Sequence, residues 1–320
     1  MATPSLNRNL KPGAYAATLT FFTQSSTLDL ETLKHHILRL MGSGVSGIIA
    51  LGSNGEAVHL DRQERKTVVK CIVDTLAANG HGDTPVIVGA SAQSLHETIE
   101  LCQEAKESGG SHVLVLPPSY FTAAMIPDTI YDFYIKVAAA SPLPVILYSF
   151  PAVSSGITMS SDLLIRISNG HPNIVGTKFT CGDTGKLARV ARAMDGMTPS
   201  QPEKPYWVAA GLADFTLQAL AVGASGVVAG GANILPKMVV KVYELFAEGR
   251  FQEATQLQSL LSEGDWPHTA AGISGTKAVL QEAFQYGGPP RSPLAVVPTV
   301  TAQTLKKDMQ EALEYENSIR

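Results

Sequence analysis

The sequence predicts an α/β protein that folds as a (β/α)8 barrel, in which helices surround a closed parallel sheet. Short apolar runs rich in β-forming residues recur along the chain, and helical patterns separate them. The runs are spaced by about 20 to 40 residues, the size of one strand–helix unit. They are almost continuously apolar, as expected for parallel strands buried on both faces. The eight runs are Tyr15–Phe22, Gly47–Leu51, Pro85–Gly89, Val113–Leu116, Pro144–Tyr148, Ile174–Lys178, Tyr206–Ala210 and Ser225–Ala229.

Amphipathic spacing and capping residues predict the helices. Asp61 and Ser94 each precede a glutamate by three residues, which is the pattern of a helix start. His35 and His36 fall inside the first helical pattern, and we expect them at the surface or at an interface. That pattern places one apolar face at Leu30, Leu33, Ile37, Leu40 and Met41.

The chain of 320 residues changes from strand–helix units to helices alone after the eighth run, and no linker sequence marks the boundary. At roughly 150 residues per domain two domains are allowed, but a single large barrel fits the length equally well. We expect residues 1–235 to form the barrel with the catalytic site. Residues 236–320 read as a helical extension packed on the barrel, broken by Gly264–Pro267 and by the turn cluster Gly287–Pro293.

Composition excludes several classes of protein. A hydrophobic fraction of 45% supports a large core, and a net charge of −4 offers no basic field for nucleic acid. No apolar run reaches the roughly 18 residues that span a bilayer. The three cysteines form no CxxC pair, which argues against a disulfide framework or a structural zinc site. The first thirteen residues lack the apolar core of a secretory signal, so we expect a cytoplasmic protein, with a mitochondrial presequence as the alternative.

Two glycine-rich segments imitate cofactor motifs in the wrong context. Gly42–Gly47 has the glycine spacing of a dinucleotide site, but it closes a helix and leads into a strand instead of the reverse. Gly182–Lys186 is too short for a phosphate-binding loop, and Leu187 stands where serine or threonine is needed. We therefore expect no cofactor and no metal.

The segment Gly52-Ser53-Asn54-Gly55-Glu56 follows the second run directly, at the expected catalytic rim. Two glycines bracket two small polar residues, so backbone N–H groups and a hydroxyl can converge on an anion such as a carboxylate. An ordinary strand–helix turn explains the same residues equally well.

Lys178 ends the sixth run, and Tyr148 ends the fifth. Burial at the tip of an apolar strand disfavours the charged ammonium and frees the amine to attack a carbonyl. A phenol on the neighbouring strand could carry protons during imine formation. The alternatives are a rim lysine paired with a carboxylate and an aromatic residue that merely lines the barrel.

Together these segments resemble the dihydrodipicolinate synthase / N-acetylneuraminate lyase family of pyruvate-dependent class I aldolases. The resemblance rests on Gly52–Glu56, on Tyr148–Pro151 and on Gly176–Lys178, which occur in the family's order and at predicted strand tips. It runs from about Gly13 to Asn233 and extends loosely through the helical tail. It implies a barrel with a C-terminal helical extension, usually assembled as a homotetramer of two tight dimers.

The resemblance also implies a role for each matching residue. Lys178 would form the Schiff base with a 2-oxo acid, and Tyr148 would relay protons. Ser53 and Asn54 would hold the pyruvate carboxylate and link a hydroxyl network. Tyr120 matches a tyrosine that the family lends across a subunit interface. Two further positions, Gly211 and Val228, match backbone carbonyls that line the same pocket.

One departure bears on the substrate. Dihydrodipicolinate synthases place an arginine shortly after the tyrosine motif, whereas this chain has Ala152–Gly156 there without arginine. Losing that guanidinium weakens recognition of the carboxylate of aspartate semialdehyde. The Ser53-Asn54 pair and Tyr148-Ser149 are closer to 4-hydroxy-2-oxoglutarate aldolases. The segments Lys178–Gly182 and Gly185–Leu187 are closer to fungal 2-keto-3-deoxy-sugar-acid aldolases.

We therefore expect a lyase that cleaves a 4-hydroxy-2-oxo acid to pyruvate and an aldehyde through a Schiff base on Lys178. Dihydrodipicolinate synthase is the alternative within the family. A non-catalytic barrel that senses a 2-oxo acid is the alternative from another class of protein. A metal-dependent aldolase is disfavoured because the eight histidines show no ligand spacing.

Overall fold

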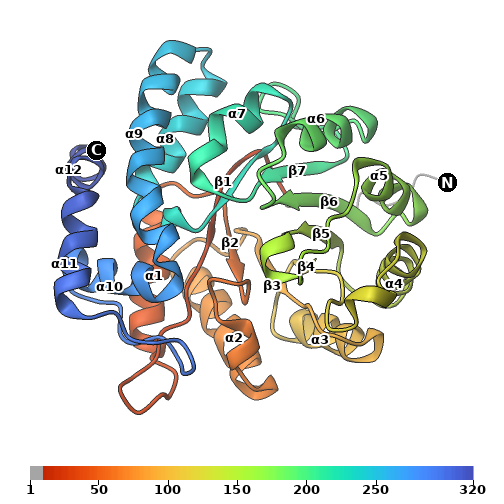
Figure 1. Cartoon of the computed structure of the whole chain (residues 1–320), viewed down its shortest axis with the longest axis horizontal. Helices are drawn as coiled ribbons and strands as arrows, with labels where there is room; N and C mark the ends of the chain where they lie inside the picture. Colours follow the sequence, from red (N-terminus) through yellow and green to blue (C-terminus); the bar gives the residue numbers. More distant parts are fainter. Residues whose placement is uncertain (1–9, 320) are drawn as a thin grey trace.

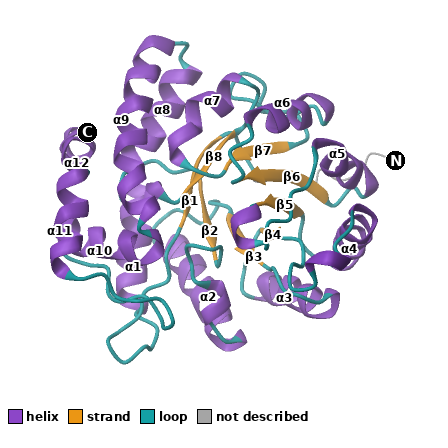
Figure 2. Ribbon diagram, in the orientation of Figure 1, coloured by secondary structure: helices purple, strands orange, loops and turns teal. Residues whose placement is uncertain are grey.

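The computed structural model describes residues 10–319. Eight parallel strands pair in chain order, and β8 pairs with β1 to close the barrel (Figures 1 and 2). Each of the eight predicted runs overlaps one strand, which confirms the fold class. The strands are β1 (Gly13–Ala17), β2 (Gly47–Ala50), β3 (Val86–Gly89), β4 (His112–Val115), β5 (Val145–Ser149), β6 (Ile174–Phe179), β7 (Trp207–Ala210) and β8 (Gly226–Ala229).

Helices follow the strands and form the outer layer of the molecule. Short 3-10 turns stand between several strands and the helices after them; these are η1 (Ala57–His59), η2 (Thr122–Ala124), η3 (Pro151–Val153), η4 (Ala213–Phe215) and η5 (Gly231–Asn233). The helices are α1 (Leu30–Gly42), α2 (Arg62–Ala78), α3 (Leu95–Glu107), α4 (Pro127–Ala140), α5 (Ser161–Gly170), α6 (Thr184–Ala193), α7 (Thr216–Ala221), α8 (Pro236–Ala247), α9 (Phe251–Ala270), α10 (Gly272–Phe284), α11 (Thr299–Asp308) and α12 (Gln310–Ser318). None of the helices within residues 10–319 is long and apolar enough to cross a membrane.

The predicted helix signals agree with the structure. Asp61 forms a full capping box with Glu64 at the start of α2, and Ser94 accepts the backbone N–H of Glu97 at the start of α3. At the other end of a helix, α1 stops at Gly42. Gly44 then takes the left-handed conformation (φ +84°) that turns the chain into β2. The glycines of this segment therefore serve an αβ loop, as expected.

The first strand is shorter than its apolar run. It ends at Ala17, whereas the sequence predicts a strand that continues to Phe22. Leu19, Phe21 and Phe22 are nevertheless buried, because they pack in the core on the helix side of the barrel. An apolar run indicates that residues are buried, but not that they pair with a neighbouring strand. The run therefore overestimates the length of this strand.

The expected break at Gly264–Pro267 is wrong, because α9 runs unbroken from Phe251 to Ala270. Pro267 removes one helical N–H, yet its own carbonyl still accepts the N–H of Ala271 at 3.2 Å. Gly264 marks a close helix contact: a Cβ there would lie 2.5 Å from the Cβ of Ala312 on α12. The second expected break is confirmed, since Gly287–Pro293 lies between α10 and α11.

Helices α8 to α12 lie together at one side of the barrel (Figure 1). Helix α8 packs against β1, α7 and α9, and α9 in turn packs against α10 and α12. The division of the chain at residue 235 stays a prediction.

His36 corrects another expectation, because its side chain is fully buried and not at the surface. Its Nε2 lies 2.9 Å from Oδ1 of Asn233, and its Nδ1 lies 2.8 Å from the hydroxyl of Tyr286. Asn233 uses its amide nitrogen to bond the carbonyls of Ala17 and Gly230. Its Oδ1 is thus free to accept a hydrogen bond from the imidazole, so His36 ties α1 to the turn η5 after β8 as a neutral donor.

Side chains that point inward fill the barrel. Tyr15 and Trp207 meet edge to face with ring centroids 5.2 Å apart. The interior is thus packed with side chains, as in other barrels of this class, whose active sites lie at the carboxyl ends of the strands. The inward cluster also contains Ile49, Ile87, Leu114, Ile146, Tyr148, Ala209 and Val228.

Candidate active site

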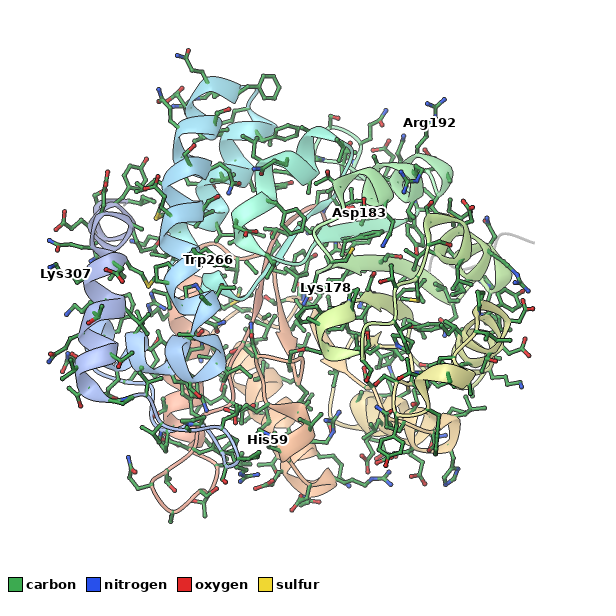
Figure 3. The ribbon with its side chains drawn as sticks, in the orientation of Figure 1. His59, Lys178, Asp183, Arg192, Trp266 and Lys307 are labelled. Atoms are coloured by element: carbon green, nitrogen blue, oxygen red, sulfur yellow. The ribbon has the colours of Figure 1, made fainter. Side chains whose placement is uncertain are left out.

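Lys178 and Tyr148 meet inside the mouth of the barrel. Strands β5 and β6 are paired so that Tyr148 stands directly beside Lys178. The Nζ of Lys178 donates a hydrogen bond to the Tyr148 hydroxyl at 3.2 Å and lies 4.3 Å from the centre of the ring. Figure 3 shows Lys178 close to the ring of strands, far from Lys307 on the outer helices. Parallel pairing thus brings together the two residues that the sequence analysis singled out.

The environment of Lys178 disfavours the alternative of a rim lysine. Only 4% of its surface is exposed. Within residues 10–319 its amine forms no ion pair with a carboxylate, and the partner of that amine is the hydroxyl of Tyr148. A buried amine without a counter-charge is a group suited to attack a carbonyl carbon.

Ser53 and Tyr148 line one cavity of about 760 Å³ at the carboxyl ends of β2 and β5. This volume suits a small-molecule substrate. His59 also lines this cavity, together with Ile273 and Leu294 from the C-terminal part of the chain. Ser53 therefore shares a cavity with Tyr148, and its role in binding an anion stays a prediction.

Asn54 faces a different neighbour. Its Nδ2 lies 3.4 Å from the carbonyl of Ala17 at the end of β1. It also packs so closely on Gly230 that a Cβ at that glycine would be 2.6 Å from the Asn54 Nδ2. The Asn54 amide thus braces the turn against β1 and β8.

Thr180 is a candidate residue that the sequence analysis missed. It follows Lys178 by two residues, and its buried hydroxyl has no hydrogen-bond partner within the described part of the chain. Gly211 after β7 approaches it so closely that a Cβ there would lie 1.9 Å from the Thr180 Oγ1. A buried hydroxyl left without a partner is a signal for a ligand, but only the structure reveals that it is unpaired.

The other two predicted residues lie in contrasting places. Val228 on β8 is buried in the inward cluster that also contains Tyr148. Tyr120, in the loop after β4, is 79% exposed and meets the exposed ring of Phe121 edge to face, with centroids 5.1 Å apart. Within one chain Tyr120 therefore stays outside the site, and its role across an interface stays a prediction.

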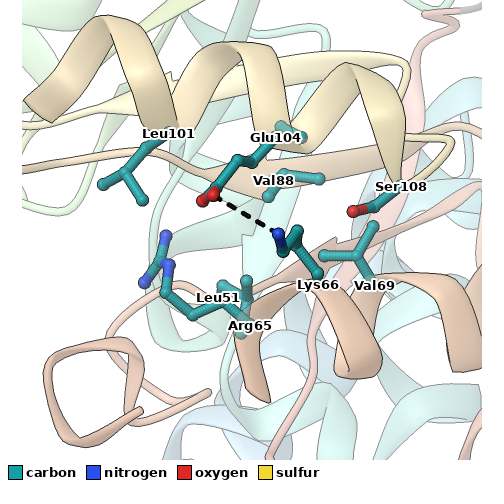
Figure 4. A pocket seen from close by; sticks show the side chains of 9 residues that line it. Leu51, Arg65, Lys66, Val69, Val88, Leu101, Glu104 and Ser108 are labelled. Atoms are coloured by element: carbon teal, nitrogen blue, oxygen red, sulfur yellow. Dashed lines mark ion pairs between the residues drawn. The ribbon is translucent and has the colours of Figure 1, made fainter. Parts of the chain in front are cut away.

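A second cavity, between α2 and α3, is too small for a substrate. Its volume of about 10 Å³ is near that of a single water site. Lys66 and Glu104 form an ion pair of 3.6 Å across it, and Arg65 and Leu101 lie beside them (Figure 4). Within residues 10–319, no group of three or more histidine, cysteine, aspartate or glutamate side chains could hold a metal ion.

Comparison with known proteins agrees with this geometry. Residues 11–312 match the model of the Dihydrodipicolinate synthetase family. An L-threo-3-deoxy-hexylosonate aldolase of Aspergillus niger is 47% identical to this chain, and the alignment covers 97% of each protein. A mitochondrial protein of Emericella nidulans, assigned as a 4-hydroxy-2-oxoglutarate aldolase, is 42% identical over 98% of each. A solved structure of a protein assigned to the dihydrodipicolinate synthase family, from Coccidioides immitis, has a TM-score of 0.85 at 31% identity and covers 97% of this chain and 98% of that one.

Proposed function

Because this chain belongs to the dihydrodipicolinate synthetase family, we propose that it is a class I aldolase, a lyase that cleaves a 4-hydroxy-2-oxo acid to pyruvate and an aldehyde. The observation that carries the proposal is the buried Lys178 amine, whose hydrogen bond goes to the Tyr148 phenol and not to a carboxylate.

The chemistry starts when the Nζ of Lys178 attacks the C2 carbonyl of the substrate and water leaves. The protonated imine withdraws electrons, so the C3–C4 bond breaks and an enamine remains on the lysine. The proton of the C4 hydroxyl leaves at the same time. Tyr148, whose hydroxyl is 3.2 Å from the reacting nitrogen, gives its own proton to the water that leaves during imine formation and then takes the C4 hydroxyl proton as a phenolate. Protonation at C3 and hydrolysis of the imine then release pyruvate and the free lysine.

The remaining residues bind the substrate. Ser53 and its neighbouring backbone N–H groups hold the carboxylate of the pyruvate unit, and Asn54 keeps their turn in place. The resemblance to the family assigns the backbone carbonyls of Gly211 and Val228 to the same substrate site. The unpaired hydroxyl of Thr180 donates to an oxygen of the substrate.

The names of the relatives suggest two candidate substrates for this chain, a 2-keto-3-deoxy-sugar acid and 4-hydroxy-2-oxoglutarate. Condensation of pyruvate with aspartate semialdehyde is the second candidate reaction. The stretch Ala152–Gly156, which covers the end of η3 and the turn after it, contains no arginine for the second carboxylate. That absence favours the aldol cleavage over the condensation.

Borohydride reduction in the presence of pyruvate tests the reaction class. One reduced pyruvate adduct is expected, and peptide mass mapping should place it on Lys178. Turnover assays with both aldol substrates and with aspartate semialdehyde then separate the candidate reactions. An adduct on another lysine, or binding of a 2-oxo acid without any product, would contradict the proposal. Activity unchanged by EDTA is expected, since the imine and not a metal accepts the electrons.

We also propose a homotetramer in which Tyr120 of one subunit completes the site of its neighbour. Its exposure together with Phe121 supports this arrangement. Co-expression of Tyr120→Ala chains with Lys178→Met chains tests it, because each mixed pair then holds one site with both an intact lysine and an intact tyrosine. Activity above that of either variant alone is expected, and no such gain would contradict the arrangement.

A cytoplasmic location is proposed, with the mitochondrion as the alternative.

A further inference from the structure

We infer that Lys277 and Arg291, from the C-terminal part of the chain, position the carboxylate-binding turn Gly52–Gly55 through the side chain of Glu56. The inference rests on the proposed function, because it states that these residues raise the affinity of the enzyme for the carboxylate of its 2-oxo acid. Glu56, Lys277 and Arg291 are positioning residues and need not touch the substrate.

The Glu56 carboxylate is fully buried, and each of its oxygens has a partner. Its Oε1 accepts from the Nζ of Lys277 at 2.5 Å. Its Oε2 accepts from the backbone N–H of Arg291 at 2.9 Å and lies 3.1 Å from Nδ1 of His59. Two of these three donors lie more than 200 residues further along the chain.

The backbone of the turn depends on this anchor. Glu56 has a φ of +50°, a left-handed conformation that a residue with a side chain adopts only where its surroundings hold it. In that conformation its N–H bonds to the carbonyl of Ser53 at 3.0 Å. The hydroxyl of Thr20 holds the carbonyl of Gly55 at 2.7 Å. The carboxylate of Glu56 therefore determines where Ser53 and the N–H groups beside it point.

The C-terminal partners are themselves held rigidly. The side chain of Lys277 on α10 is fully buried, and its Nζ also donates to the carbonyl of Pro289 at 3.1 Å. The guanidinium of Arg291 forms two hydrogen bonds with Glu64, of 2.6 and 2.7 Å, and a third with the carbonyl of His59 at 2.8 Å. The loop after α10 is thus fixed both to the turn and to the start of α2.

A buried ion pair is a poor source of stability, because removing two charges from water costs about as much as their attraction returns. It does enforce one geometry, since neither charge tolerates the loss of its partner. Glu56 follows Ser53 by three residues. By fixing the position of Glu56, the ion pair with Lys277 therefore affects how Ser53 and its neighbours bind the carboxylate. Glu316 on α12 offers a matched contrast: its buried carboxylate accepts the backbone N–H groups of Lys237 and Met238 at 3.0 and 2.8 Å, away from the turn.

The test compares Lys277→Met, Glu56→Gln, the double variant of both and the control Glu316→Gln. For each, kcat and KM are measured with the aldol substrate, together with the melting temperature and the pyruvate concentration that gives half-maximal borohydride trapping. A positioning role predicts that KM and the half-trapping concentration rise about tenfold in the variants of the pair, while kcat changes less than about threefold. Saturating pyruvate should still label Lys178 completely.

The double variant separates positioning from folding. It leaves no unpaired buried charge, so its melting temperature should return toward that of the wild type while its KM stays raised. The Glu316→Gln control should lower the melting temperature without raising KM. A double variant with wild-type KM, or a control that raises KM equally, would overturn the positioning role. No Lys178 adduct in the wild-type protein would instead refute the proposed function, and the inference with it.

Discussion

Replacing Tyr148 by phenylalanine removes one hydroxyl and leaves the rest of the barrel mouth in place. The ring keeps its packing against Phe150, at a centroid distance of 5.7 Å, because the phenol oxygen takes no part in that contact. What disappears is the hydrogen bond of 3.2 Å to Lys178. A proton relay therefore loses its acceptor, while the core loses no packed atom other than the oxygen.

The expected loss of activity is large and the loss of stability small. A positioned general acid or base contributes about 100-fold to 10,000-fold to a rate, which corresponds to roughly 3 to 5 kcal/mol of activation free energy. One hydrogen bond contributes only about 1 kcal/mol to folding, so the melting temperature should change by about 2 °C. The variant should thus be folded and nearly inactive.

The assay couples released pyruvate to lactate dehydrogenase and follows kcat at saturating substrate. Tyr134→Phe is the matched control, because it removes another buried tyrosine hydroxyl, one that bonds to the Val115 carbonyl at 2.9 Å outside the site. The control should lose stability and keep its kcat. If Tyr148→Phe retains kcat within about threefold of the wild type, Tyr148 is not the proton relay and the mechanism is refuted.

Two further predictions address the substrate pocket and the core. Thr180→Val removes a buried hydroxyl without a partner in the described chain, so it should leave the melting temperature equal or higher while kcat/KM falls about tenfold or more; equal kcat/KM would remove Thr180 from the site. Burial lowers the pKa of His36 to about 3, below the roughly 6.5 of an unfolded histidine. The unfolded chain therefore binds more protons between these values, and the stability that neutral His36 provides should be lost as the pH falls from about 6.5 toward 3. Thermal melts of His36→Gln should show a weaker decline over that range, and an identical decline would assign the acid sensitivity to other groups.

The sequence predicts the central pair of the site because parallel strands end at the same rim. Lys178 and Tyr148 are each the last residues of an apolar run, and adjacent runs become adjacent strands in a barrel, so their proximity follows from chain order. The turn Gly52–Glu56 follows from the same reasoning. The family motifs then predict roles for Tyr120, Gly211 and Val228, which no local pattern indicates.

The sequence misses features whose partners are distant along the chain or whose backbone is irregular. Pro267 reads as a helix break, yet the surrounding helices hold α9 together. His36 reads as a surface residue, because its neighbours in sequence do not reveal the buried partners Asn233 and Tyr286. Each miss concerns a tertiary contact that outweighs a local preference.

The sequence by itself thus determines the barrel, because apolar periodicity and strand order act over short stretches of chain. Its family motifs indicate the reaction class and predict Lys178 as the nucleophile. Only the tertiary structure decides that Thr180 has an unpaired hydroxyl and that Glu56 is joined to Lys277 and Arg291. Contacts of this kind depend on which surfaces meet when the C-terminal helices pack on the barrel. No spacing within the turn Gly52–Glu56 can report the distant lysine that neutralises its glutamate.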